Sequence, residues 1–133
     1  MIPLSFTSIA ERIRQQQLPA YDLVIGIGNG GIVPASLLAF ILNTELRIIV
    51  LNYRDENNTP RYEDPLVINL PEGLNLNGKK VLLVDDVSVT GKTLERAKGL
   101  LVGAEVTTLT MKGKADVVLF PEIRECVRWP WKE

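Results

Sequence analysis

The sequence predicts an α/β fold in which one parallel sheet carries helices on both of its faces. Short apolar runs, such as Leu23–Ile27 and Val81–Val84, alternate along the chain with segments that have helical spacing. Continuous apolar runs are typical of strands buried on both faces, and strand–helix alternation is typical of parallel sheets. The chain has 133 residues, of which 46% are hydrophobic, and this suits one domain with a packed core. We therefore expect a single domain over residues 1–133.

Four elements are expected before residue 52. Phe6, Ile9 and Ile13 recur at helical spacing, and Ser5 or Thr7 can cap the helix that they predict. A glycine cluster at 28–31 separates the next strand from a second, strongly apolar helix. The expected elements are a helix over Ser5–Gln17, a strand over Leu23–Ile27, a helix over Ile32–Asn43 and a strand over Arg47–Leu51.

The composition of the chain changes at Asn52–Pro65, a polar segment with few residues suited to a core. Loops of this length inside a compact domain are often lids or binding segments, so we expect a mobile loop, with a plain surface excursion as the alternative. The remaining elements complete the alternation. They are strands over Val67–Leu70, Lys80–Val84, Glu105–Met111 and Asp116–Leu119, a turn over Pro71–Gly78, a helix over Gly91–Leu101, and an extended piece over Cys126–Trp131 that packs back on the body.

Composition excludes several functional classes. With 15 basic and 16 acidic residues the net charge is -1, which argues against binding to a nucleic acid polymer or a membrane surface. There is no histidine for a Ser-His-Asp triad, and the single cysteine, Cys126, rules out an internal disulfide. The most apolar segment, Ile32–Leu42, falls short of the roughly 20 residues that span a bilayer. We expect a soluble, cytoplasmic protein.

Residues 26–31 match the GxGxxG pattern of dinucleotide-binding turns. A dehydrogenase would also need an acid about 20 residues further on, where Leu51, Asn52 and Tyr53 stand instead. A more general property remains, because consecutive glycines let backbone N–H groups approach an anion beside a helix N-terminus. A dinucleotide site and a purely structural tight turn stay open as alternatives.

Asp85 and Asp86 are expected to leave the strand that ends at Val84 and to enter a turn rich in serine, threonine and glycine. Carboxylates accept hydrogen bonds from sugar hydroxyls, and such a turn can cradle a phosphate at a helix start. Ribose 5-phosphate presents both groups. The alternative is that Asp86 only caps a helix while Asp85 is solvated. Since ligands of parallel sheets bind beyond the carboxyl ends of strands, loops 28–31 and 85–91 are candidates for one shared site.

Residues 81–93 resemble the phosphoribosyl pyrophosphate (PRPP) signature of the type I phosphoribosyltransferases. Residues 25–35 are similar to the pyrophosphate-binding loop of that family, and Asn52–Pro65 falls where the family has its flexible catalytic loop. The ending Trp129–Glu133 is similar to that of the xanthine-guanine branch. The resemblance covers nearly the whole chain and implies a Rossmann-like parallel sheet with a small C-terminal hood segment.

The resemblance implies an Mg²⁺-dependent enzyme that transfers ribose 5-phosphate from PRPP to a nucleobase, foremost a 6-oxopurine such as hypoxanthine, guanine or xanthine. It also implies a homodimer or higher homo-oligomer. A PRPP- or nucleotide-binding regulatory protein of the same fold, without transferase activity, is the alternative from a different functional class.

The resemblance also assigns roles to individual residues. Asp85 and Asp86 would be the catalytic pair that holds the ribose hydroxyls, directly or through the water shell of Mg²⁺. Lys112 would read the purine 6-oxo group, and Trp129 is the nearest aromatic residue for stacking on the base. The PRPP-binding residues would be Asn29, Gly30, Gly31, Asp85, Asp86, Val89, Thr90, Gly91, Lys92 and Thr93.

Three positions depart from the family pattern and favour the regulatory alternative. Val89 stands where purine enzymes usually carry an aspartate that serves as acid and base at purine N7. Cys126 aligns with the stacking aromatic residue, and Asn29 replaces an arginine or lysine that adds positive charge beside pyrophosphate. Loop residues could compensate, with Asp55, Glu56, Glu63 or Asp64 as the acid/base and Arg54 and Arg61 as extra cations.

Overall fold

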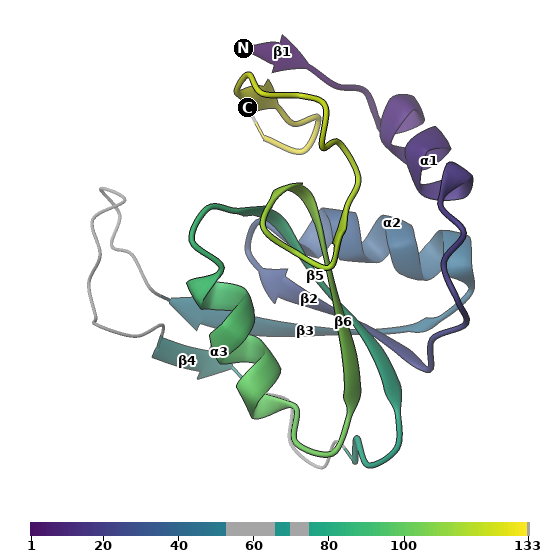
Figure 1. Ribbon diagram of the computed structural model, residues 1–133, viewed down its shortest axis with the longest axis vertical. Coiled ribbons are helices and arrows are strands. Elements are labelled where there is room, and N and C mark those ends of the chain that lie inside the picture. The colour runs from purple at the N-terminus through teal and green to yellow at the C-terminus, as the bar shows by residue number, and fades with distance from the viewer. Residues whose placement is uncertain (53–65, 70–74, 133) are drawn as a thin grey trace.

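The computed structural model describes residues 1–52, 66–69 and 75–132, and it confirms the predicted α/β class (Figure 1). In this part of the chain, one sheet contains six strands in the order β4-β3-β2-β5-β6-β7. The strands are β2 (Leu23–Gly28), β3 (Glu45–Asn52), β4 (Leu66–Asn69), β5 (Lys80–Ser88), β6 (Glu105–Gly113) and β7 (Val117–Val118).

All neighbouring strands pair in parallel except β3 and β4, which are antiparallel. The predicted parallel sheet is therefore confirmed for β3, β2, β5, β6 and β7, and β4 joins its edge as an antiparallel strand. Strand β7 is also shorter than the predicted Asp116–Leu119.

Within the described residues, three helices cover the sheet: α1 (Phe6–Gln15), α2 (Ile32–Leu42) and α3 (Lys92–Leu100). The Ser5 hydroxyl caps α1 by accepting a hydrogen bond of 3.0 Å from the backbone N–H of Ser8, as the sequence predicts. Helix α2 ends at Asn43, which adopts the left-handed conformation typical of a helix C-terminus. The predicted helices thus all form, with ends that differ by at most two residues.

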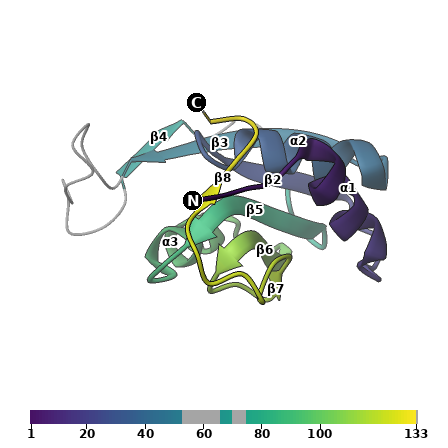
Figure 2. The ribbon, with the colours of Figure 1, turned by 90° about the horizontal axis from the view of Figure 1, so that it is seen from above.

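Hydrophobic cores lie on opposite faces of the sheet, with α2 and α3 on either side (Figure 2). Strand β5 supplies both cores because successive side chains of a strand point to opposite faces. Leu82 and Val84 join the core beneath α1 and α2, whereas Val81 and Leu83 join the core beneath α3. The expected helices on both faces are confirmed, and none of the described helices is long and apolar enough to cross a membrane.

The C-terminal segment packs back on the body, as predicted. Strand β8 (Val127–Arg128) pairs in parallel with β1 (Ile2–Pro3), and residues 121–132 together with β1 form the hood. Trp129 fixes the hood because its side chain is only 4% exposed and belongs to the core beneath α1 and α2. The ring of Trp131 stacks on it, with 5.4 Å between ring centroids.

Strand β5 is longer than predicted, which changes the place of the acid pair. Its pairing with β6 continues through Asp85↔Thr110 to Ser88↔Gly113, so the two acids lie within the strand rather than after it. The predicted loop falls outside the described residues except for Asn52, the last residue of β3. The loop acids Asp55, Glu56, Glu63 and Asp64, and the loop cations Arg54 and Arg61, lie outside them as well.

Candidate functional site

The carboxyl ends of β2 and β5 lie side by side, since β5 pairs with β2 along the sheet. The glycine loop at 28–31 follows β2, and the turn at 89–91 connects β5 to α3. In Figure 1 the hood lies over the end of the sheet from which this turn leaves. The two predicted loops and the acid pair therefore meet at one edge of the sheet, under the hood.

The glycine loop is packed so closely against β5 that side chains do not fit. A Cβ atom on Gly30 would lie 2.5 Å from Oδ2 of Asp86, and one on Gly31 would lie 2.6 Å from the Val84 carbonyl oxygen. The peptide bond between Gly28 and Asn29 is cis, and Asn29 itself is exposed. Glycine at 30 places the loop backbone directly on the acid pair, which a merely structural turn does not require.

Asp86 is nearly buried, with 9% of its surface exposed. Its Oδ1 accepts a hydrogen bond of 2.7 Å from the Val87 backbone N–H, and its Oδ2 accepts one of 2.9 Å from the ammonium of Lys132. The residue that precedes α3 as its cap is Gly91, five positions further on. The alternative in which Asp86 only caps a helix is therefore wrong.

Asp85 is half-buried, and its Oδ1 accepts a hydrogen bond of 2.8 Å from the Asp86 backbone N–H. Burial disfavours the charged form, and the nearby Asp86 carboxylate adds to this, so the pKa of Asp85 is raised to about 8. Asp85 therefore takes up a proton more readily than a solvated carboxyl group does. The paired acids thus differ in character, and Asp85 is not the solvated carboxylate of the alternative interpretation.

The turn after β5 encloses a cavity of about 120 Å³, lined by Val87–Thr93. The Thr90 hydroxyl accepts a hydrogen bond of 3.2 Å from the Lys92 backbone N–H, and Gly91 adopts a positive φ of 84° just before α3 begins. Backbone N–H groups at a helix start attract anions. The cavity therefore suits a phosphate group, and it contains the predicted residues 89–93. Val89 is 76% exposed beside it.

The two residues predicted to contact the base have different surroundings. Lys112, in the last part of β6, donates from its ammonium to the Glu125 carbonyl oxygen at 2.5 Å, so it also ties β6 to the hood. Trp129 is buried and one face of its ring is covered by Trp131. The ring of Trp129 thus contributes to the core, and its stacking on a base stays a prediction.

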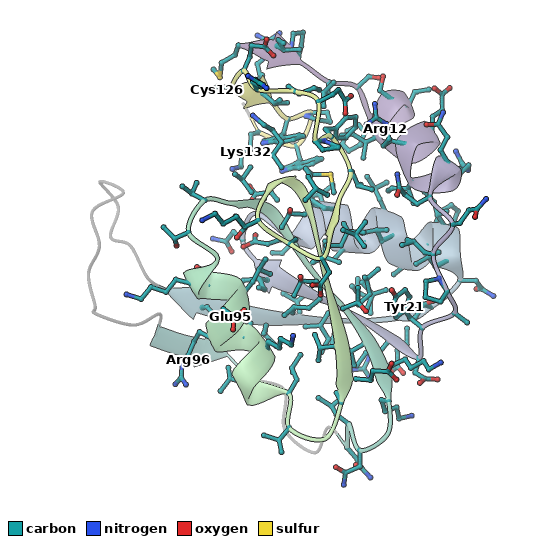
Figure 3. The ribbon with its side chains drawn as sticks, viewed as in Figure 1. Arg12, Tyr21, Glu95, Arg96, Cys126 and Lys132 are labelled. Carbon is teal, nitrogen blue, oxygen red and sulfur yellow. The ribbon has the colours of Figure 1, made fainter. Side chains whose placement is uncertain are left out.

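Lys132 is the site residue that the sequence did not indicate. It lies 46 positions from Asp86 along the chain, and the only signal near it was the Pro-Trp ending. Figure 3 shows Lys132 on the side of the hood nearer the sheet, with Cys126 further out. Cys126 is a free, exposed cysteine.

Residues 5–112 match the family model for the phosphoribosyl transferase domain. The xanthine-guanine phosphoribosyltransferase of Cereibacter sphaeroides is 32% identical over 115 residues, which cover 84% of this chain and 66% of that protein. The orotate phosphoribosyltransferase of Pyrobaculum islandicum is 30% identical over 93 residues, 65% of this chain and 44% of that protein. A crystal structure of a purine phosphoribosyltransferase from Pyrococcus horikoshii has a TM-score of 0.76 and 28% identity, with 99% of this chain and 93% of that chain covered.

The chain spans less than two thirds of the length of both curated relatives. The family match nevertheless begins at the cap of α1 and extends to Lys112, so it includes the glycine loop, the acid pair and the phosphate-sized cavity. This family match agrees with the resemblance of residues 25–35 and 81–93 to the motifs of the type I phosphoribosyltransferases. On this ground the chain belongs to the phosphoribosyl transferase domain family.

Proposed function

We propose that this chain is a phosphoribosyltransferase that moves ribose 5-phosphate from PRPP to a nucleobase, foremost a 6-oxopurine. The carrying observation is the contact between the glycine loop and the acid pair, where a Cβ on Gly30 would lie 2.5 Å from Asp86 Oδ2. PRPP bears its 5-phosphate, ribose hydroxyls and pyrophosphate on one five-membered ring, so its three binding segments must lie side by side. The glycine loop, the acid pair and the turn at 89–91 do lie side by side at the carboxyl end of β5, which supports the proposal.

In the proposed reaction the bond between ribose C1 and the pyrophosphate oxygen breaks, and its electron pair leaves with pyrophosphate. A ring nitrogen of the base forms the new bond to C1 and gives up its proton to water or to the departing pyrophosphate. Asp85 and Asp86 orient the ribose hydroxyls, and residues 89–93 hold the 5-phosphate. Catalysis then rests on holding donor and base in line and on stabilising the charge that develops.

The acid pair fits a role for Mg²⁺, which prefers oxygen ligands and is usually bound by one or two carboxylates together with substrate phosphates and water. Asp85 and Asp86 would hold the ion, through water. No cluster of three or more acidic or cysteine side chains occurs among residues 1–52, 66–69 and 75–132 to form an all-protein cage. The ion would neutralise negative charge on the departing pyrophosphate.

A 6-oxopurine is supported by the similarity to xanthine-guanine and purine phosphoribosyltransferases and by Lys112. An ammonium has three N–H donors, and Lys112 uses one of them for the Glu125 carbonyl oxygen. Another donor can face the 6-oxo group. An orotate phosphoribosyltransferase is almost equally similar, so the choice of base needs an experiment.

The test is an assay of the whole chain with PRPP and Mg²⁺ against hypoxanthine, guanine, xanthine, adenine, orotate and uracil. We expect nucleoside 5-monophosphate and pyrophosphate in equal amounts, with the 6-oxopurines turned over fastest. Faster turnover of orotate would replace the proposed base class and keep the enzyme class. Absence of product with every base would count against a transferase.

A regulatory protein that binds PRPP or a nucleotide without turnover is the second candidate. Val89 favours it, because an apolar side chain, 76% exposed beside the cavity, cannot move a proton to or from a base. Titration calorimetry separates the two candidates. Tight binding of PRPP by a protein that converts none of the bases would support the regulator.

A further inference from the structure

Lys132 and the glycine loop approach the same oxygen atom. The Lys132 ammonium donates to Asp86 Oδ2 at 2.9 Å, and the backbone of Gly30 is so close that a Cβ there would lie 2.5 Å from this oxygen. The ammonium is therefore placed where the glycine loop meets the acid pair. This contact joins the hood to the part of the site that would receive pyrophosphate.

The hood holds Lys132 in this place through its backbone. The Lys132 N–H donates to the Trp129 carbonyl oxygen at 3.1 Å, and the Trp129 side chain is buried in the core. Trp131, between them, stacks on Trp129. A lysine anchored in this way loses less conformational freedom on binding a ligand than one on a free tail.

A pyrophosphate bound at the glycine loop would need a nearby cation, and Lys132 is placed to supply one. Residues 28–31 contain no charged side chain, so a bound pyrophosphate would gain no cation from the loop and would face the Asp86 carboxylate. The Lys132 side chain is 56% exposed, while that of Asp86 is 12% exposed, so the ammonium has an open side. An ammonium can bind the carboxylate and an anion at once, since it has three N–H donors.

We propose that Lys132 is a pyrophosphate-binding residue, which keeps one N–H on Asp86 and donates another to the pyrophosphate of the sugar donor. The inference rests on the proposed function and deepens it. Lys132 would supply, from the far end of the chain, the positive charge that Asn29 does not bring to the glycine loop.

The test compares Lys132→Ala and Lys132→Met with Lys132→Arg, which keeps the charge. Lys79→Ala is the matched control, because Lys79 is exposed just before β5, at the opposite end of that strand from Asp86. Titration calorimetry with inorganic pyrophosphate and Mg²⁺ should show about 10- to 100-fold weaker binding in the alanine and methionine variants, in line with the loss of one charged hydrogen bond. Lys132→Arg should retain most of the affinity, and Lys79→Ala all of it.

Binding of ribose 5-phosphate, which lacks pyrophosphate, should change little in Lys132→Ala. Equal weakening of both ligands would mean that Lys132 only positions Asp86, and it would overturn the proposal. Unchanged or tighter pyrophosphate binding would overturn it too, the latter because the lysine would then compete with the ligand for Asp86. The calorimetry needs no turnover: a Lys132 effect in a protein that converts no base keeps this inference and removes the enzyme proposal.

Discussion

The side chain of Asp86 is held by contacts from distant parts of the chain. One oxygen accepts from the next backbone N–H, at Val87, and the other accepts from Lys132 in the hood. The glycine loop closes a third side, at Gly30. A carboxylate fixed in this way is preorganised for a ligand, because its rotamer is already set before the ligand arrives.

The first prediction concerns Asp86→Asn. The amide can still accept from the Val87 N–H, and the Lys132 ammonium that loses its acceptor is 56% exposed and can be solvated, so we expect only a small change in melting temperature. An amide attracts neither sugar hydroxyls nor a hydrated cation as a carboxylate does, so PRPP binding should weaken by about 10- to 100-fold. Calorimetry and thermal unfolding measure the two effects. A loss of folding stability as large as the loss of binding would remove Asp86 from the ligand site.

Lys112→Ala is expected to change the preference among bases while PRPP affinity stays nearly constant. The variant removes an N–H donor at the end of β6 and also releases the Glu125 carbonyl oxygen of the hood. Relative kcat/KM across the base panel is the measurement, and Lys114→Ala, two residues further on, is the control. Identical selectivity of both variants and the native protein would place Lys112 outside the base site.

At this scale the sequence indicated the acids and the turn that lie together in the structure, because both are local features, while their roles in binding stay predictions. Asp85 and Asp86 are consecutive, and residues 89–91 form one turn between β5 and α3. The burial of Trp129 and the contact of Lys132 with Asp86 were not foreseen, since both depend on how the tail packs. A pattern of apolar and aromatic residues does not tell which ring is buried and which lysine reaches a carboxylate across the fold.

Among the elements, β6 controls the shape of the turn after β5 through Gly113. This glycine has a positive φ of 102°, and a Cβ there would lie 1.9 Å from the Ser88 carbonyl oxygen. The next N–H, of Lys114, donates to that same oxygen at 2.7 Å. The end of β6 therefore fixes the residue at which β5 gives way to the turn.

We predict that Gly113→Ala lowers the free energy of unfolding by about 2 kcal/mol or more, from left-handed strain and the clash with Ser88. Phosphate binding should weaken too, because Ser88 must shift. Gly99→Ala is the matched control: its Cβ would meet no atom within 4 Å inside α3, and helix propensity predicts a gain of up to about 1 kcal/mol. Urea unfolding measures both variants. Equal stabilities would refute the packing argument.

The order of the elements was predictable because hydrophobic periodicity is a local signal, but some boundaries were not. Strand β5 was expected to end at Val84, since the acids interrupt the apolar run. It continues to Ser88 because pairing with β6 satisfies the backbone there, whatever the side chains are. The antiparallel direction of β4 likewise depends on pairing with β3 and has no signature in its own residues.

For the whole molecule, the homo-oligomer implied by the family resemblance stays a prediction, and the surface of α2 is where we test it. The helix contains no charged residue, and Phe40 on its outer side is 81% exposed. The predicted homodimer would bury this ring. We expect Phe40→Asp to lower the molar mass in solution from that of a dimer to that of a monomer, as measured by light scattering. Val102→Asp, also at an 81% exposed position but after α3, should leave the mass unchanged. The same molar mass for the native protein, Phe40→Asp and Val102→Asp would contradict an interface at Phe40.

The attachment of α1 to the C-terminal part of the chain gives the fold a dependence on pH. Arg12 donates to both carboxylate oxygens of Glu122 and to the Leu119 carbonyl oxygen, and its guanidinium lies 4.4 Å from the centre of the Phe120 ring. The hydrogen bonds from Arg12 are the largest cause that lowers the pKa of Glu122, from 4.5 to about 2. Glu122 thus binds its proton less readily in the folded chain than in the unfolded one.

The lowered pKa of Glu122 determines how the stability of the protein should depend on pH. A carboxyl whose folded pKa is lowered stabilises the protein fully above its unfolded pKa of 4.5, and the contribution disappears as the pH falls from there toward 2. Glu122→Gln should therefore melt below the native protein at pH 7, and the difference should close between about pH 4.5 and pH 2. Glu11→Gln, an exposed change on the helix that carries Arg12, serves as control. A constant difference between Glu122→Gln and the native protein across this range would mean that the Arg12–Glu122 pair, solvated as it is, does not hold α1 to the hood.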